Sequence, residues 1–452
     1  METPFGRSAA NAAQYRLAPD IFYRKYGSDT IIYQTSKSKV YHMSESCFDV
    51  LDYYRQNISE KSIFEYLGTR YDMDSAELQS ELQPFISELA RLDILLQKEN
   101  KMPDASRLEA KVFENILVPS KDLYSCMFEL TYRCNERCKH CYCVTDSADG
   151  ELTADEIRNL IDQLYELNTL ELVFTGGDLF VRKDTFEILE YAYSKGFLIN
   201  IFTNGIALKD DDFFRLQQIH PKSISFSLYD TIPDKHDMFT SVQNSFTRTL
   251  SAAKKCRALG IPVHIKTNVT KDNFSRIGDF TEMVMSIGAD LEISLSITPR
   301  NDGDLSPTQY RLSCVGDYKN VLDKISPYLS ESSNPAEFIP LSSNRDLCRA
   351  GKNSLSINPY GKVFACNALL IECGDTRKQT LAEIWNKSEA LEKIRSYKTG
   401  DLIGCDGCED RTYCSFCMGN SYTETGSPLK KYREACNITK AQTELRKEKK
   451  NV

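Results

Sequence analysis

The cysteines of this chain are gathered in two regions. The sequence has 452 residues and 16 cysteines, of which four lie within ten residues and seven more, apart from Cys373, fall in the last quarter of the chain. These eleven are Cys134, Cys138, Cys141, Cys143, Cys348, Cys366, Cys405, Cys408, Cys414, Cys417 and Cys436. The first residues hold no apolar stretch typical of a secretion signal, so we expect a cytoplasmic protein. In that reducing compartment, clustered thiols more often bind metal or act in catalysis than form disulfides.

The overall composition excludes several classes of protein. Hydrophobic residues make up 41% of the chain, which is enough to bury sizeable cores. The chain has no run of about 18 apolar residues, so we expect no membrane partner and no transmembrane helix. The net charge of -8 argues against a broad surface for nucleic acid or anionic lipid.

Strand and helix patterns alternate over residues 121–330. The six expected strands are residues 124–130, 170–174, 197–202, 222–228, 261–269 and 291–297. A helical pattern follows the first strand at residues 153–167, where Thr153 and Glu156 form a capping box. Six such repeats predict an α/β fold with parallel strands and right-handed crossovers, either a doubly wound sheet or a barrel. Functional loops are then expected at the carboxyl ends of the strands.

Cys134, Cys138 and Cys141 follow directly after the first of these strands, in the segment FELTYRCNERCKHC. Three thiolates on one loop can hold three irons of a four-iron cluster and leave the fourth iron open. An open iron is useful when a small molecule chelates it through adjacent amine and carboxylate groups. The alternative is a zinc site, for which Cys-x3-Cys-x2-Cys on one loop is a poorer frame than paired Cys-x2-Cys turns. Cys143 could be a fourth ligand, but it lies awkwardly close to Cys141 in sequence.

This strand, its cysteine loop and the repeats that follow resemble the radical S-adenosylmethionine (SAM) superfamily. The resemblance implies a partial (β/α)6 barrel whose open cluster binds SAM and generates a 5′-deoxyadenosyl radical. It also implies that loop residues at the strand ends contact SAM: His140, Gly176, Gly177, Asp178, Asn204, Ser227 and Asn268. Asp178 stands where the family usually has Glu, and we expect its carboxylate to pair with the SAM ammonium group. The glycines before it allow close approach of the backbone, whereas Asn204 and Ser227 could equally be strand-end caps.

The cysteines of residues 340–440 resemble the SPASM extension of radical SAM enzymes that modify peptides. By family pairing, one auxiliary [4Fe–4S] cluster is held by Cys348, Cys366 and Cys417, and a second by Cys405, Cys408, Cys414 and Cys436. With the first cluster this makes three. Seven cysteines cannot fill two four-ligand sites, so one position is open, accepts substrate or borrows Cys373 or Cys126. Zinc is the alternative metal for the paired cysteines.

One residue in this region departs from a related activity. Enzymes of this kind that oxidise a Cys or Ser of sulfatases have an Asp after the Gly-x4-Cys cysteine, which acts as a base. This chain has Asn367 there, and an amide cannot serve as an anionic base. That particular activity is therefore disfavoured, and no general base is assigned.

Residues 17–100 form a separate pattern of three short strands followed by three helices, which is typical of a small winged-helix domain. The third helical stretch, residues 72–93, is rich in Asp and Glu and would repel DNA phosphates. Pattern and position resemble the PqqD-type element that grips the leader of a ribosomally made precursor peptide. A polar linker over residues 101–120 and a basic, solvated tail over residues 441–452 complete the expected domains.

Together these resemblances imply a radical SAM maturase that crosslinks the core of a precursor peptide through a thioether, carbon–carbon or ether bond. They also imply an electron donor such as flavodoxin or ferredoxin. Two other interpretations remain: a protein side-chain oxidase of the sulfatase-maturase type, and a non-enzymatic iron–sulfur regulator that uses the winged helix on DNA.

Overall fold

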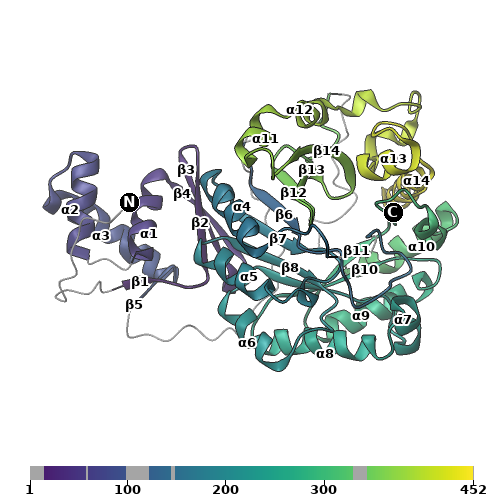
Figure 1. Ribbon diagram of the computed structural model, residues 1–452, viewed down its shortest axis with the longest axis horizontal. Helices are drawn as coiled ribbons and strands as arrows, with labels where there is room; N and C mark the ends of the chain where they lie inside the picture. The colour runs from purple at the N-terminus through teal and green to yellow at the C-terminus, as the bar shows by residue number, and fades with distance from the viewer. Residues whose placement is uncertain (1–14, 57–59, 98–121, 144–147, 329–343, 451–452) are drawn as a thin grey trace. The chain divides into compact units, whose positions relative to one another are not determined.

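The computed structural model describes residues 15–56, 60–97, 122–143, 148–328 and 344–450. The chain divides into two compact units, residues 1–119 and 120–452, which are described separately (Figure 1). The linker expected at residues 101–120 lies outside the described residues.

The first unit contains a three-stranded antiparallel sheet and three helices. The sheet has the order β2-β3-β4, and a short antiparallel pair, β1 and β5, lies beside α1 and α3. The strands are β1 (Tyr15–Leu17), β2 (Ile21–Tyr26), β3 (Asp29–Gln34), β4 (Lys39–Ser44) and β5 (Leu95–Gln97). The helices are α1 (Glu45–Arg55), α2 (Glu60–Tyr71) and α3 (Ser75–Arg91). This is the arrangement that the sequence pattern predicts.

A single apolar cluster holds the first unit together. Leu51 of α1, Ile63 of α2 and Leu89 of α3 are fully buried in it, together with Ile32 of the sheet. These residues recur at helical spacing on one face of each helix, which is why short helices can form there. Strand β4 is different, because none of its residues is buried and, among the described residues, it pairs only with β3. It is therefore an open edge of the sheet.

The second unit is built on a nine-stranded sheet with the order β11-β10-β9-β8-β7-β6-β12-β13-β14 (Figure 1). Neighbours from β6 to β11 are parallel, as the six strand–helix repeats predict. These strands are β6 (Ser125–Glu129), β7 (Glu171–Thr175), β8 (Leu198–Thr203), β9 (Ser223–Ser227), β10 (Val263–Asn268) and β11 (Asp290–Ser294). The helices between them are α4 (Ala154–Glu166), α5 (Thr185–Ser194), α6 (Asp210–Gln218), α7 (Pro233–Thr240), α8 (Ser245–Ala258) and α9 (Ile277–Ser286). The fold class is thus confirmed as the radical SAM type of partial barrel, and its strand ends bring the functional loops to one edge.

The cysteine-rich region does not form a separate sheet. Its first strand, β12, pairs in parallel with β6, and β13 and β14 follow as an antiparallel hairpin. The strands are β12 (Ser354–Ile357), β13 (Lys362–Cys366) and β14 (Leu369–Asp375). The helices are α10 (Val315–Ile325), α11 (Leu381–Lys387), α12 (Glu389–Ser396), α13 (Met418–Thr425) and α14 (Arg433–Lys450).

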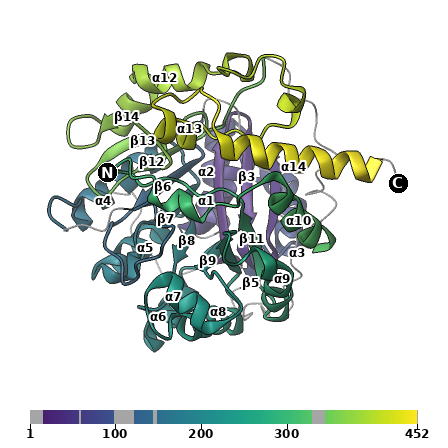
Figure 2. The same cartoon turned by 90° about the vertical axis from the view of Figure 1, so that its right-hand side faces the viewer.

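The end of the chain is also different from the expected solvated tail over residues 441–452. Helix α14 lies along α10, as Figure 2 shows, and Ala441 and Leu445 are buried. Arg446 is buried as well. The lysines at this end hide the apolar stripe in the sequence, since they stand between its members.

No helix among the described residues has both the length and the apolar character needed to cross a membrane.

Candidate radical and iron–sulfur site

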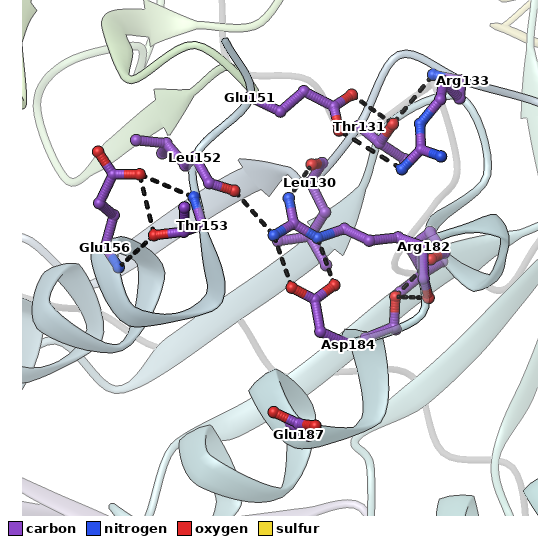
Figure 3. A network of polar contacts seen from close by, with 12 residues as sticks. Leu130, Thr131, Arg133, Glu151, Leu152, Thr153, Glu156, Arg182, Asp184 and Glu187 are labelled. Atoms are coloured by element: carbon purple, nitrogen blue, oxygen red, sulfur yellow. Dashed lines mark hydrogen bonds and ion pairs between the residues drawn. The ribbon is translucent and has the colours of Figure 1, made fainter. Parts of the chain in front are cut away.

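The base of the first cysteine loop is braced by Arg182, which follows the short helix after β7 (Figure 3). Its guanidinium donates hydrogen bonds to the backbone oxygens of Leu130 at 2.9 Å and Leu152 at 2.8 Å. It also forms an ion pair with Asp184 at 2.6 Å. Arg182 is buried, so this fork of charge-assisted bonds fixes where β6 ends and the loop begins.

A second brace acts on the loop itself. The hydroxyl of Thr131 donates to Glu151 at 2.5 Å and accepts a bond from the backbone N–H of Arg133 at 3.1 Å (Figure 3). The Arg133 guanidinium lies 3.5 Å from the same glutamate. These contacts therefore fix the positions of Thr131 and Arg133, which precede Cys134.

The loop after β7 packs directly against the cysteine loop. The backbone N–H of Gly177 donates to the oxygen of Thr131 at 2.7 Å, and that of Asp178 donates to the oxygen of Arg133 at 3.0 Å. A Cβ at Gly176 would lie 2.2 Å from the Thr131 oxygen, and one at Gly177 would lie 2.3 Å from the Arg133 oxygen. Both positions therefore require glycine, in agreement with the close approach expected there.

We expect Gly177→Ala to displace the cysteine loop, because its Cβ would collide with two backbone oxygens that cannot move independently. The variant should lose most of its SAM affinity and reconstitute less iron at the first cluster. Gly278→Ala is the matched control, since a Cβ there meets nothing within 4 Å. Equilibrium dialysis with SAM and iron analysis would compare the two. Equal SAM affinity in both variants would show that the loop tolerates the displacement.

The three cysteines of the loop are brought together. Burial raises the pKa of Cys134 to about 12, and the charges of Cys141 and Cys134 contribute to raising that of Cys138. The pKa of Cys141 is lowered to about 7, chiefly by a hydrogen bond with Cys143. Buried thiols with raised pKa values ionise only when a cation compensates their charge, which is the situation of metal ligands.

Asp178 has a structural role at the strand ends. Its carboxylate is buried and accepts hydrogen bonds from the Thr203 hydroxyl at 2.6 Å, the Asn204 N–H at 2.8 Å and the Phe180 N–H at 2.9 Å. The side chain therefore ties the end of β7 to the end of β8, so Asp178 acts at least as a positioning residue. The expected pairing of its carboxylate with the SAM ammonium group stays a prediction.

Replacing Asp178 with Asn should consequently lower stability. An amide presents an NH2 group to one of the donors that the carboxylate now accepts, so a buried donor loses its partner. We expect the free energy of unfolding to fall by about 1–3 kcal/mol, measured by denaturant titration. If stability were unchanged while SAM affinity fell, the carboxylate would instead contact SAM.

The remaining predicted SAM contacts lie at the strand ends around the loop. Asn204 donates to Asn135 at 2.6 Å, and its amide is 3.8 Å from the sulfur of Cys134. His140 stacks on Phe239 with ring centroids 5.0 Å apart, and burial lowers its pKa to about 4, so the ring is neutral. These contacts favour a packing role for the imidazole over acid–base chemistry.

Ser227 and Asn268 end neighbouring strands, β9 and β10. Ser227 hydrogen-bonds Tyr229, and the Asn268 amide donates to the oxygen of Ser296 at 3.2 Å. Both have protein partners, so they act at least as strand-end caps. Their contact with SAM stays a prediction.

The C-terminal cysteines separate into two groups in space. Burial raises the pKa of Cys366, with contributions from Cys417 and Cys348. Burial likewise raises the pKa of Cys414, and the thiols that add to it are Cys405, Cys436 and Cys408. These are the same two groups that the family pairing implies.

The turn at Cys366 and the start of α13 meet closely. A Cβ at Gly419 would lie 2.5 Å from the oxygen of Ala368, so only glycine permits this approach. Cys417 is the N-cap of α13, and the backbone N–H groups of Gly419 and Asn420 lower its pKa against the effect of burial. N–H groups directed at a thiolate are typical of iron–sulfur sites.

Neither candidate for a borrowed ligand joins the first of these groups. Cys126 is fully buried in the apolar core on β6. The Cys373 thiol donates to the oxygen of Ile371 at 3.4 Å, within β14. Neither of them is among the charges that act on Cys366 or Cys417. This disfavours the borrowed-ligand alternative.

The chemistry of the donors fits iron–sulfur clusters. All three groups consist of thiols. Beside Cys138, the buried Oε1 atom of Glu136 has no hydrogen-bond partner among the described residues. Within the same part of the chain, no group of three or more His, Cys, Asp or Glu side chains is placed to hold a single metal ion.

Comparison with known proteins places the chain in a class. The sequence matches the radical SAM superfamily over residues 128–284 and SPASM, an iron–sulfur cluster-binding domain, over residues 348–418. Domains of these two kinds bind SAM and [4Fe–4S] clusters. The chain thus carries a radical SAM domain and a SPASM domain, and it is a radical SAM enzyme.

The chain is similar in sequence to two relatives and in fold to one solved structure, as follows. The AdoMet-dependent heme synthase of Methanosarcina barkeri is 28% identical over 331 residues, which are 67% of this chain and 93% of that protein. The PqqA peptide cyclase of Bradyrhizobium diazoefficiens is 25% identical over 299 residues, 63% of this chain and 78% of that one. The crystal structure of Streptococcus suis SuiB bound to precursor peptide SuiA superposes with a TM-score of 0.61 at 15% identity, and covers 93% of this chain and 99% of that one.

One group at the site is missing from the sequence-based expectations. Glu129 ends β6, is buried, and accepts hydrogen bonds from two tyrosines of the cysteine loop, Tyr132 and Tyr142. The signal in the sequence is an acidic residue at the end of an otherwise apolar strand, in Phe128-Glu129-Leu130.

Proposed function

We propose that this enzyme is a maturase that holds the leader of a ribosomally made precursor peptide and installs a crosslink in its core. The observation that carries the proposal is the extent of the shared architecture. The superposition on SuiB covers 93% of this chain. The alignment with the heme synthase covers 93% of that protein but only 67% of this chain. SuiB is bound to a precursor peptide in that structure, which supports a peptide as the substrate here.

In this proposal the ten cysteines hold three [4Fe–4S] clusters. One is held by the loop of Cys134, Cys138 and Cys141, and the two auxiliary clusters are held by the two C-terminal thiol groups. When bound, SAM and the first cluster supply a hydrogen-abstracting radical, and the auxiliary clusters supply an electron acceptor. Gly176 and Gly177 allow the loop after β7 to pack closely against the cysteine loop, and Asp178 joins the ends of β7 and β8.

The first unit offers a place for the leader at the open edge of β4. An extended peptide can add there as a further strand, because backbone groups at a sheet edge provide hydrogen bonds to any sequence. Tyr41 of β4 lies close enough to Asp93 and Arg91, at the end of α3, for their charges to affect its pKa. The strand edge and the helix end are thus neighbours, as a groove for leader side chains requires.

The same unit is poorly suited to DNA. Glu77, Glu81 and Glu88 are exposed on α3, and the nearby Arg91 is engaged by Glu88 at 2.5 Å. Carboxylates on the helix that would enter the groove repel phosphates.

The bond formed is a thioether, or a carbon–carbon or ether link. If a Cys sulfur of the peptide is the donor, the fourth position beside Cys348, Cys366 and Cys417 is the place where it would dock. A cytoplasmic electron donor such as flavodoxin or ferredoxin would reduce the first cluster.

A heme precursor is the second candidate substrate, and the 28% identity to a heme synthase favours it. The two candidates are separated by what the enzyme needs for turnover. Reconstituted enzyme with SAM and dithionite would be given the peptide encoded by a short reading frame beside its gene, with and without the leader segment. We expect modification of the complete peptide and little of the leaderless one. Turnover of a heme precursor, with the complete peptide unchanged, would overturn the proposal.

A further inference from the structure

A chain of hydrogen bonds joins the two cysteine regions. The side-chain amide of Asn367, which follows Cys366, donates to the hydroxyl of Tyr142 at 3.3 Å. Tyr142, which follows Cys141, donates to Oε1 of Glu129 at 2.7 Å. The hydroxyl of Tyr132 donates to Oε2 of the same glutamate at 2.9 Å. Glu129 is therefore the acceptor at which these contacts converge.

The buried position of Glu129 disfavours the charged form of its carboxyl group. It is 3% exposed and makes no ion pair among the described residues. Burial raises its pKa to about 7, although hydrogen bonds from Tyr142 and Tyr132 oppose this. The titratable groups that face it are these two tyrosines and Cys143. All three are neutral when protonated, so none of them compensates the carboxylate.

The other members of the chain cannot hold an extra proton near neutral pH. Asn367 is an amide, and burial raises the pKa of both tyrosines above its usual range. A phenol that accepts a proton from one side can release its own to the other side without a net change. Glu129 is the one group of the four that can keep the proton.

We propose that Glu129 accepts the proton released when the crosslink closes, and that it receives this proton through the hydroxyl of Tyr142. The inference rests on the proposed function. In that reaction a peptide C–H bond breaks and its hydrogen atom leaves on 5′-deoxyadenosine. The carbon then bonds to a sulfur, oxygen or carbon atom of the peptide whose own bond to hydrogen breaks. The proton from that bond goes to Glu129, and the remaining electron goes to the iron–sulfur oxidant.

The location suits this step. Tyr142 adjoins a ligand of the cluster at which hydrogen abstraction begins, and Asn367 adjoins a ligand of the cluster that would take the electron. Tyr142 and Asn367 are hydrogen-bonded to each other, and the proton acceptor is bonded to Tyr142.

The first test uses no peptide. Difference infrared spectroscopy of the reconstituted, full-length enzyme would follow the carboxylic-acid band as pH rises through about 7. We expect a component that disappears over this range in the wild type and is missing in Glu129→Gln. Comparison of the two proteins is essential, because burial also raises the pKa of Glu136 and Glu434 to about 7. Identical bands in both proteins would overturn the inference.

The second test separates hydrogen abstraction from bond closure. The probe is the fully deuterated peptide of the adjacent reading frame, with deuterium in 5′-deoxyadenosine and crosslinked product measured together. Glu129→Gln should lower the yield of crosslinked peptide about 100-fold more than it lowers deuterium transfer. Glu129→Asp keeps a carboxylate and should restore part of the closure. Crosslinking by Glu129→Gln at the wild-type rate would overturn the inference.

Two tyrosine variants keep the test decisive if Glu129→Gln does not fold. Tyr142→Phe leaves the carboxylate and removes the relay hydroxyl, so it should show the same loss of closure with deuterium transfer retained. The control is Tyr191→Phe, which removes a hydroxyl bound to Asp162 at 2.8 Å on the outer helices and should close the crosslink normally. If Tyr142→Phe also closed it normally, the relay would be wrong. Failure of the wild type to transfer deuterium would contradict the proposed function, whereas the infrared titration would still decide whether Glu129 binds a proton.

Discussion

Changing Cys134, Cys138 and Cys141 together to alanine should abolish reductive SAM cleavage and remove about a third of the iron. Ten cysteines in three groups predict roughly 12 iron per chain after anaerobic reconstitution, of which about four belong to the first loop. The two C-terminal groups lie on other elements, so their iron should remain. The expected SAM contacts at the strand ends lie beside the first loop, so the open position beside Cys348, Cys366 and Cys417 should not reduce SAM in its place.

Iron and zinc analysis with electron paramagnetic resonance would measure this result. Cys314→Ala is the control, because Cys314 is exposed and belongs to none of the three groups. Zinc in the purified wild type with only about four iron per chain would contradict the auxiliary clusters. SAM cleavage by the triple variant would contradict the assignment of the first loop.

A chain that begins at Met102 should lose most of its precursor binding but keep its SAM cleavage. The division into two compact units places all ten predicted cluster ligands in the second one. Tethering by the leader raises the effective concentration of the core peptide, so its loss should lower modification by a factor of about 10² to 10⁴. Very high peptide concentrations should restore part of the rate, because the chemistry itself is intact.

Anisotropy of a labelled precursor peptide and the rate of 5′-deoxyadenosine formation would measure the two effects. Modification at the full-length rate would mean that the first unit is a structural cap. Loss of SAM cleavage in a folded, iron-replete protein would mean that residues before Met102 belong to the catalytic unit.

Regular patterns in the sequence were sufficient for most of the fold. Central strands such as β8 are marked by apolar runs buried on both faces, and the helices between the strands by apolar stripes such as that of α4. Thr153 and Glu156 form the expected capping box at the start of that helix. The cysteine groups were predictable because cysteine is a rare residue and the spacings within each group are short or match those of a known family.

The parts that could not be predicted depend on contacts between distant residues. Strand β12 joins the barrel by pairing with β6, more than 200 residues earlier in the chain, and no local pattern records that partner. The sequence shows that Asp178 follows a strand, but not that Thr203 and Asn204 supply its hydrogen bonds. Glu129 was missed for the same reason, since its partners lie on a loop whose path the sequence does not specify.

The most direct test of the account is the fate of hydrogen from the peptide. The fully deuterated precursor would be incubated anaerobically with reconstituted enzyme, SAM and reductant, and both products would be analysed by mass spectrometry. We expect deuterium in 5′-deoxyadenosine and a peptide that has lost this deuterium and one further hydrogen, with the link in its core. The second hydrogen is the ordinary isotope where the partner atom is sulfur or oxygen, because S–H and O–H positions exchange with water. An unmodified peptide, together with 5′-deoxyadenosine that contains no deuterium, would contradict the account.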